Sequence, residues 1–291
     1  MTAAGIRRDL KKWRFWGRFS TQALSSVGFF SVLAGVVSAL FPTALPPHGA
    51  ILAIAAILVS LVYGILRSWP RPVQQVYGSP NTEIRIVEGD LFSQDENIVI
   101  GMADTFDTEI PHVIDEKSVQ AQLLKSVYKG DLKALDNALE EALKEHTAIR
   151  QFSPSDRKPG KQAAYPLGTV VTIEPSPRRF YFCVAYTEMN TRNEAHGSID
   201  GVWRSLNSLW DEVRAKSNGD PVSIPVIGGG QARISQYFPA QDSIRFIILS
   251  YMFASRKEKV ASRLSIVVRK SDVGAIDMLE LQAFLKSLRP S

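Results

Sequence analysis

Residues 222–234 read VSIPVIGGGQARI, a short apolar run that passes directly into three consecutive glycines. The run has the length and composition of a buried strand. Glycine lets the backbone approach a ligand closely, and the N–H groups of such a loop can bind an anion, phosphate above all. The stretch therefore predicts a strand followed by a phosphate-binding loop. The candidate ligand contacts are Gly228, Gly229, Gly230, Gln231, Ala232 and Arg233.

This interpretation has an alternative, because a glycine triplet also suits an ordinary flexible turn. The sequence has neither the Walker A pattern nor the GxGxxG pattern, so a standard NTPase or dinucleotide-binding fold is excluded. Arg233 would place a positive charge close to a phosphate or a ribose.

Runs typical of strands and of amphipathic helices alternate on both sides of this stretch. Strands are expected at 83–87, 97–101, 168–174, 179–186, 222–227 and 263–269. Helices are expected at 118–146 (in two pieces), 194–216, 239–254 and 273–288. The alternation predicts a three-layer α/β/α domain with a mixed sheet. In open sheets of this kind, ligands bind beyond the carboxyl ends of the strands.

Two further strand ends carry polar residues. Asp90 follows the strand at 83–87 and could accept a hydrogen bond from an exocyclic amine such as that of adenine; Leu91 lies beside it. The loop after the strand at 97–101 holds four more candidates. Asp104 and Asp107 could bind ribose hydroxyls, Phe106 could stack on a base, and Thr105 lies between them, so the set is Asp104, Thr105, Phe106 and Asp107. For each residue the alternative is a loop position that caps its own backbone.

Signals of catalysis are weak. The four histidines show no spacing typical of a metal site, and no nucleophile elbow is present. The single cysteine, Cys183, lies in an apolar run and is expected to be a small core residue. We therefore expect no metal, no cofactor and no catalytic residue.

The N-terminal part of the chain differs in composition. From Phe19 to Leu66 there is no Lys, Arg, Asp or Glu. Two apolar runs, at 21–41 and 50–66, are joined there by a short proline-rich segment. Because a helix needs about 17 to 25 apolar residues to cross a bilayer, both runs predict membrane-spanning helices that form a hairpin. A cleaved signal peptide and a buried hairpin of a soluble domain are the alternatives.

Charge indicates the orientation of this hairpin. Residues 1–72 carry eight basic residues and one acidic residue, whereas residues 73–291 carry 26 basic and 28 acidic residues. The basic residues flank the apolar runs, so the positive-inside rule predicts a two-pass protein of the inner (cytoplasmic) membrane with both termini in the cytoplasm. The nearly neutral remainder has no basic stripe for nucleic acid. Small residues lie at three- and four-residue spacing on one face of the first helix: Gly28, Ser31, Gly35 and Ser38. This pattern predicts close helix packing and a homo-oligomer.

The three loops together resemble those of a macro domain, the ADP-ribose-binding α/β module. Residues 84–90 look like the opening strand of that family followed by Gly-Asp, which implies that Asp90 contacts adenine. Residues 226–234 look like its second phosphate loop, which implies ligand contacts from Gly228 to Gln231. The stretch 97–107 takes the place of the first ribose and phosphate loop but lacks the Asn-Ala-Ala-Asn and triple-glycine elements. Since that loop holds the distal ribose in catalytic members, the departure argues against hydrolase activity.

Two membrane helices followed by a divergent macro domain resemble the membrane effector of bacterial Thoeris anti-phage systems. The stretches IVIGMADTFDTE at 98–109 and YPLGTVV at 165–171 carry the resemblance. It implies a receptor for a nucleotide signal that a partner TIR-domain enzyme makes from NAD. The signal would be ADP-ribose or an ADP-ribose conjugate, in some systems a histidine conjugate. Binding would lead the membrane part to disrupt the bilayer and kill the infected cell.

Taken together, the sequence predicts a basic N-terminus and transmembrane helical hairpin within 1–72, a linker at 73–80, and a macro-like ligand-binding domain at 81–291. The leading hypothesis is a receptor and effector that is not an enzyme. The alternative is a membrane-tethered ADP-ribosyl hydrolase, and a third possibility is an anchored scaffold with an empty pocket.

Overall fold

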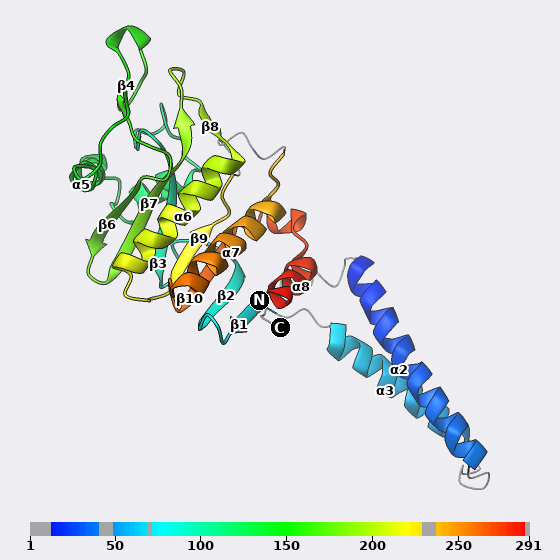
Figure 1. Ribbon diagram of the computed structural model, residues 1–291. Coiled ribbons are helices and arrows are strands. Elements are labelled where there is room, and N and C mark those ends of the chain that lie inside the picture. The colour runs from blue at the N-terminus through cyan, green and yellow to red at the C-terminus, as the bar shows by residue number, and fades with distance from the viewer. Residues whose placement is uncertain (1–12, 41–48, 69–71, 229–236, 289–291) are drawn as a thin grey trace. The chain divides into compact units, whose positions relative to one another are not determined.

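The computed structural model describes residues 13–40, 49–68, 72–228 and 237–288. The chain divides into two compact units, Met1–Pro72 and Val73–Ser291, and each is described by itself. Figure 1 shows two helices in the first unit and a sheet covered by helices in the second.

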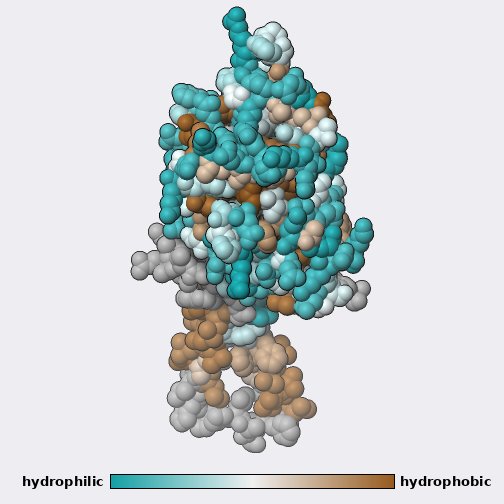
Figure 2. All heavy atoms as spheres, turned by 90° about the vertical axis from the view of Figure 1, so that its left-hand side faces the viewer, coloured by the Kyte–Doolittle hydropathy of each residue, from teal (hydrophilic) through white to brown (hydrophobic). Residues whose placement is uncertain are grey.

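The first unit consists of α2 (Trp13–Leu40) and α3 (Gly49–Ser68). Within α2, Phe15–Leu40 is long and apolar enough to cross a membrane, whereas the apolar part of α3, Leu52–Ser68, is shorter. Figure 2 shows the surface of these helices as predominantly hydrophobic. Among the described residues one helix, rather than the predicted two, therefore meets the requirement for a membrane span.

Small residues allow α2 and α3 to pack closely. The Ser60 hydroxyl donates a hydrogen bond to the Ser26 hydroxyl at 3.0 Å. A Cβ atom added to Gly64 would lie 3.1 Å from both Ala23 and the Phe19 ring, so this contact requires a glycine or a shift of its neighbours. By contrast, Gly28 and Gly35 of the predicted small-residue face have nothing within 4 Å of their Cβ positions. That face therefore takes no part in the α2–α3 contact at these two glycines.

The second unit is built on one mixed sheet with the strand order β1-β2-β10-β9-β3-β7-β6, and β8 pairs with β7. Five neighbouring strands, β2, β10, β9, β3 and β7, run parallel, whereas β1 and β6 are antiparallel at the two ends. The bounds are β1 Val73–Tyr77, β2 Thr82–Glu88, β3 Asn97–Ala103, β6 Val170–Ser176, β7 Arg179–Met189, β8 Ala195–Gly197, β9 Val222–Pro225 and β10 Arg263–Val268. A separate pair consists of β4 Arg150–Gln151 and β5 Ala163–Ala164.

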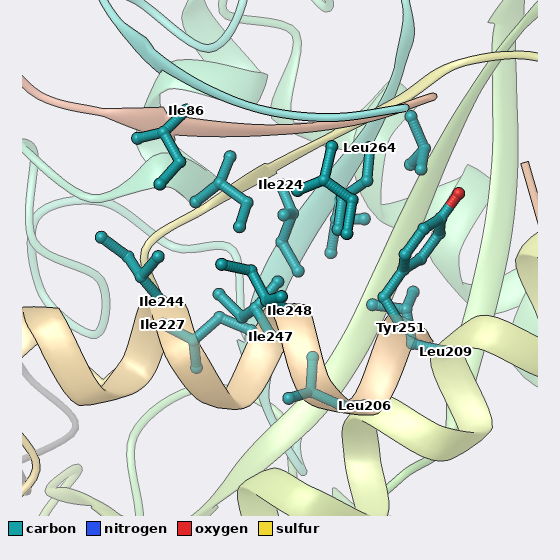
Figure 3. Packing of buried hydrophobic residues seen from close by; sticks show 14 of the residues in the cluster. Ile86, Leu206, Leu209, Ile224, Ile227, Ile244, Ile247, Ile248, Tyr251 and Leu264 are labelled. Carbon is teal, nitrogen blue, oxygen red and sulfur yellow. The ribbon is translucent and has the colours of Figure 1, made fainter. Parts of the chain in front are cut away.

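Helices cover both faces of this sheet, which confirms the predicted three-layer fold (Figure 1). The helices are α4 Val119–Ser126, α5 Leu132–Leu143, α6 Ile199–Lys216, α7 Ala240–Lys257 and α8 Met278–Ser287, with 3-10 turns at Pro154–Asp156 and Val273–Ala275. Polar side chains cap the amino ends of α4, α5, α6 and α8. Figure 3 shows how isoleucines of α7 point towards the sheet strands and fill the larger core with residues of α6.

Two segments differ from the sequence-based expectation. The predicted linker at 73–80 contains β1, which pairs with β2 from Val73↔Ile86 to Tyr77↔Thr82. The helix predicted from residue 194 begins only at Ile199, because residues 195–197 form β8 and Ser198 is the helix cap. In both cases strand pairing decides the local structure, since β1 pairs with β2 and β8 pairs with β7.

The buried carboxylate of Glu96 lies at the centre of a polar network that links three strands of the sheet. Glu96 accepts hydrogen bonds from Arg85 at 2.7 Å, from Arg263 at 2.8 and 2.9 Å, and from the Ser223 hydroxyl at 2.6 Å. Burial by itself would raise the pKa of Glu96, but hydrogen bonds from Ser223, Ser265 and Arg263 and the charge of Arg85 hold the pKa below its usual value. The three strands that the network joins are β2, β9 and β10.

We predict that Glu96→Ala destabilises the second unit by about 2–4 kcal/mol, because it leaves two arginines without their buried partner. Because the folded pKa of Glu96 is depressed, its contribution is present above the unfolded pKa and is lost as pH falls through the folded pKa. Urea unfolding of the full chain in detergent, followed by tryptophan fluorescence at several pH values, measures both effects. Glu140→Ala, at an exposed position of α5, is the control and should change stability by less than about 0.5 kcal/mol. A Glu96→Ala midpoint equal to that of the control would contradict the prediction.

Candidate functional site

The order of the strands creates a topological switch point between β9 and β3. Strands β9 and β3 are parallel neighbours, with Asn97 paired to Val222 and Ile98 paired to Ser223. The next strand beyond β9 is β10, whereas the next strand beyond β3 is β7, so the connections from the two neighbours leave in opposite directions. Ligands of open α/β sheets bind at such a switch point, outside the carboxyl ends of the strands. Both of the main predicted loops begin there.

The glycine loop follows β9 in the chain, and the structure describes its first residues. Ile227 is 4% exposed, and its carbonyl oxygen accepts a hydrogen bond from the Ser243 hydroxyl of α7 at 2.5 Å. Gly228 has φ of 86°, a backbone conformation that residues with a side chain rarely adopt. The predicted contacts Gly229, Gly230, Gln231, Ala232 and Arg233 lie outside the described residues. The structure thus describes the entry of the loop and the helix α7 that follows it.

Asp107 is held in a buried ion pair. Its carboxylate accepts hydrogen bonds from Lys158 Nζ at 3.0 Å, from the Thr105 hydroxyl at 2.5 Å and from the backbone N–H of Lys161 at 2.5 Å. The side chains of Asp107 and Lys158 are 1% and 0% exposed. In this arrangement Asp107 and Thr105 clamp the β3–α4 loop to the segment that contains residues 158–161, and both oxygens of Asp107 are already engaged.

Asp104 lies in the same loop in a different environment. Its Oδ1 accepts the backbone N–H of Met189 at 2.8 Å, and Arg150 approaches Oδ2 at 3.4 Å. Burial raises the pKa of Asp104 to about 6, although the Met189 N–H and the Arg150 charge oppose that shift. We therefore expect the protonation of Asp104 to change in mildly acidic solution.

The ring of Phe106 is part of the core. Phe106 has φ of 50° and is 0% exposed, and its ring meets that of Tyr165 edge to face at 5.9 Å. A stacked base needs an open aromatic face, and this conformation offers none. The observed role of the ring is to anchor the loop in the smaller core cluster.

The Asp90 side chain is exposed just beyond the carboxyl end of β2. The Ser93 hydroxyl donates to Asp90 Oδ2 at 3.0 Å, and Gln94 donates to the Asp90 carbonyl at 3.0 Å. Gly89, immediately before it, donates its N–H to the Val268 carbonyl of β10 at 3.0 Å. Leu91 is 5% exposed and belongs to the core, so of this pair Asp90 is the residue that reaches solvent.

Local sequence pattern does not reveal the cations that organise the β3–α4 loop. Lys158 and Arg150 come from the excursion between α5 and β6, far along the chain from Asp104 and Asp107. Lys158 lies within a Pro-, Gly- and Lys-rich stretch that has the composition of an exposed loop, and its burial follows only from the fold. Within the described residues, no group of three or more His, Cys, Asp or Glu is placed to hold a metal ion.

We predict that Asp104→Asn removes one component of the pH dependence of stability. Because the folded pKa of Asp104 is raised from 3.8 to about 6, the folded state holds the proton more tightly, and stability falls as pH rises through that window. The total fall is at most about 3 kcal/mol. Asparagine can still accept the Met189 N–H but does not titrate, so the variant should show a flatter melting-temperature profile between pH 4 and 6. Asp220→Asn, at an exposed position, should keep the wild-type profile, and an unchanged profile in Asp104→Asn would contradict the assignment.

The family model for the macro domain of the Thoeris protein ThsA matches residues 84–269, more than half of the chain. Among solved structures, the Oceanobacillus iheyensis macrodomain with MES bound is 14% identical with a TM-score of 0.50, covering 75% of this chain and 99% of that chain. The same macrodomain with ADP is 15% identical with a TM-score of 0.50, over 75% and 99% of the two chains. A mutant of it with ADPR is 14% identical with a TM-score of 0.50, over 74% and 99%.

A search of curated proteins found no match. At these identities the solved structures establish the fold, and the family model establishes the relationship. The family match covers residues 84–269, and the chain has the mixed sheet and a glycine run after β9. The chain therefore belongs to the family of macro domains found in the Thoeris protein ThsA.

Proposed function

We propose that this protein is a membrane-anchored receptor and effector of anti-phage defence that binds an ADP-ribose-derived nucleotide at the switch point between β3 and β9. The observation that carries the proposal is the run of β9 into a glycine loop at the switch point of a ThsA macro domain. A pyrophosphate needs closely spaced backbone N–H groups and a positive local potential, and a glycine loop that leads into a helix provides both.

In this proposal, each element around the switch point contacts a different part of the ligand. The glycine loop, Gly228 to Arg233, would hold the pyrophosphate together with the amino end of α7, which has no side-chain cap. Asp90 would accept a hydrogen bond from the adenine amine. Asp104 would face a ribose hydroxyl, while Thr105, Phe106 and Asp107 keep the β3–α4 loop in shape. The Oceanobacillus iheyensis macrodomain, which has the same fold, was solved with ADP and, as a mutant, with ADPR, which agrees with a ligand of this class.

The nucleotide would come from a TIR-domain enzyme, and the response would take place in the lipid bilayer. In this proposal α2 crosses the inner membrane, α3 returns as a short second span, and both chain ends lie in the cytoplasm. The absence of formal charge from Phe19 to Leu66 and the basic residues on either side support this topology. Occupied receptors would assemble as a homo-oligomer and disrupt the membrane, which would kill the infected cell.

The decisive test is calorimetric titration of the full chain in lipid nanodiscs with ADP-ribose, with hydrolysis monitored in the same samples. Wild-type protein should bind without turnover. Gly229→Val should weaken binding by at least about tenfold, because a β-branched side chain obstructs the backbone that would meet the phosphates. Gly274→Val is the matched control, since a Cβ at that glycine meets nothing within 4 Å, and it should bind as wild type does.

The other outcomes separate the alternatives. Turnover of ADP-ribose conjugates would support a membrane-tethered ADP-ribosyl hydrolase instead. No binding of ADP-ribose or of its conjugates by the wild type would refute the receptor. Equal affinity in Gly229→Val and wild type would refute the glycine loop as the phosphate site while leaving the receptor itself in place.

A further inference from the structure

We propose that the outer surface of α6 and α7 joins two copies of this chain in an antiparallel dimer. The dimer would be the unit from which occupied receptors assemble, but it is argued from this surface alone and requires no ligand. Two rows of outward-facing residues make up the surface. The α6 row is Asp200, Arg204, Asn207, Asp211 and Arg214, and the α7 row is Asp242, Phe246, Leu249, Phe253 and Arg256.

The α7 row lies on the side of its helix that points away from the sheet. Isoleucines of α7 point towards the strands and fill the larger core (Figure 3). Because an α-helix has about 3.6 residues per turn, the positions of the α7 row fall on the opposite side from Ile244 and Ile248. Phe253 is 51% exposed there, and Phe246 and Leu249 are partly exposed.

Helices α6 and α7 run side by side in the same direction. The ring centroids of Trp203 and Phe246 are 5.5 Å apart, and further along both helices Arg214 donates to the Ala254 carbonyl at 3.1 Å. Residue numbers therefore rise together along the two helices, and both amino ends lie at the same end of the surface. The α6 row faces outward as well, since α6 buries the opposite side of the helix through Val202, Leu206, Leu209 and Val213.

The middle of this surface is apolar and aromatic. Residues 246–255 of α7, FIILSYMFAS, contain no Asp, Glu, Lys or Arg. Trp203 of α6 meets the rings of both Phe246 and Phe253 edge to face, with centroids 5.5 and 6.3 Å apart. An aromatic centre surrounded by a charged rim is the usual anatomy of a protein–protein interface. The surface therefore has the composition of a docking site for another protein.

The order of charges on the α6 row indicates which protein docks there. From the amino end the row reads acidic, basic, neutral, acidic, basic, with spacings of four, three, four and three residues around Asn207. If a second α6 lies antiparallel across it, Asp200 of one copy faces Arg214 of the other, and Arg204 faces Asp211. The row is thus complementary to itself, as an interface with two-fold symmetry requires.

The α7 row has the same symmetry. Its spacings are identical, and it is centred on Leu249, with a phenylalanine on each side and opposite charges, Asp242 and Arg256, at its ends. Antiparallel pairing places Phe246 of one copy beside Phe253 of the other and each aspartate beside an arginine. The other two-fold arrangement sets α6 parallel to α7 of the second copy, which would bring the acidic ends together and the basic ends together. The charges therefore favour the antiparallel dimer.

The aromatic centre supplies the affinity, whereas the charges determine the orientation. Within one chain Asp200 already pairs with Arg204, and Asp211 pairs with Arg214, so docking only redistributes existing ion pairs. Exposed ion pairs contribute little to stability, but like charges that face each other across an interface are strongly unfavourable. The two effects can therefore be tested separately.

Sedimentation of the full chain in detergent, without ligand, tests the dimer itself. The wild type should be dimeric. Phe253→Asp should weaken self-association by about tenfold or more, because it places a charge in the apolar centre. Ile149→Asp is the control, since it changes another exposed apolar residue outside this surface, and it should remain dimeric. A monomeric wild type would overturn the proposal, and so would a dimer that Phe253→Asp leaves intact, as expected of association through α2 alone.

Two further changes test the antiparallel order. Arg204→Asp sets acid against acid and should weaken the dimer by about three- to tenfold, and the addition of Asp211→Arg should restore it. Leu249→Cys lies at the centre of the α7 row, so a short bismaleimide should join it to its counterpart, whereas Ile149→Cys should stay unlinked. The natural Cys183 is fully buried and leaves these readouts clean.

Failure of the double variant to restore the dimer, or absence of crosslinking at position 249, would overturn the antiparallel arrangement. None of these measurements uses ADP-ribose. Their failure would therefore leave the proposed receptor in place, and failure of the wild type to bind ADP-ribose would leave the dimer in place.

Discussion

The adjacency of β9 and β3 is the constraint on which the site depends. The two strands belong to distant parts of the chain, yet they run parallel as neighbours, and their onward connections diverge. Ligands of open α/β sheets bind outside the carboxyl ends of the strands at such a switch point. What this sequence adds is a glycine run in one loop and a tightly anchored acidic segment in the other. The fold supplies the location of the site, and the loops supply its chemistry.

The two loops are stabilised in different ways. The β3–α4 loop is secured by a buried ion pair and a core aromatic ring, which engage the side chains of Asp107 and Phe106. Asp104 adds a contact to the backbone of β7. The entry of the glycine loop is held through a backbone atom, the Ile227 carbonyl oxygen, which accepts a hydrogen bond from the Ser243 hydroxyl. A glycine-rich sequence suits a site that recognises its ligand by backbone N–H groups rather than by side-chain charge.

Much of the fold followed from local pattern. Periodicity located the main helices and the six principal strands, because burial of one face imposes a repeat on the sequence. It missed β1 and β8, which are short strands defined by pairing rather than by composition. The site was predicted at the level of loops but not of side chains. Asp107 and Phe106 were expected to face a ligand, and their burial depends on Lys158 and Tyr165, which lie beyond the reach of any local pattern.

The measurement that tests the account most directly is a hydrogen-exchange difference map of the full chain with saturating ADP-ribose. The account predicts that protection concentrates in peptides spanning 226–240 and 101–109, with none at the opposite edge of the sheet, around the turn between β6 and β7. Protection confined to that opposite edge, or no protection anywhere, would contradict a ligand site at the junction of β3 and β9.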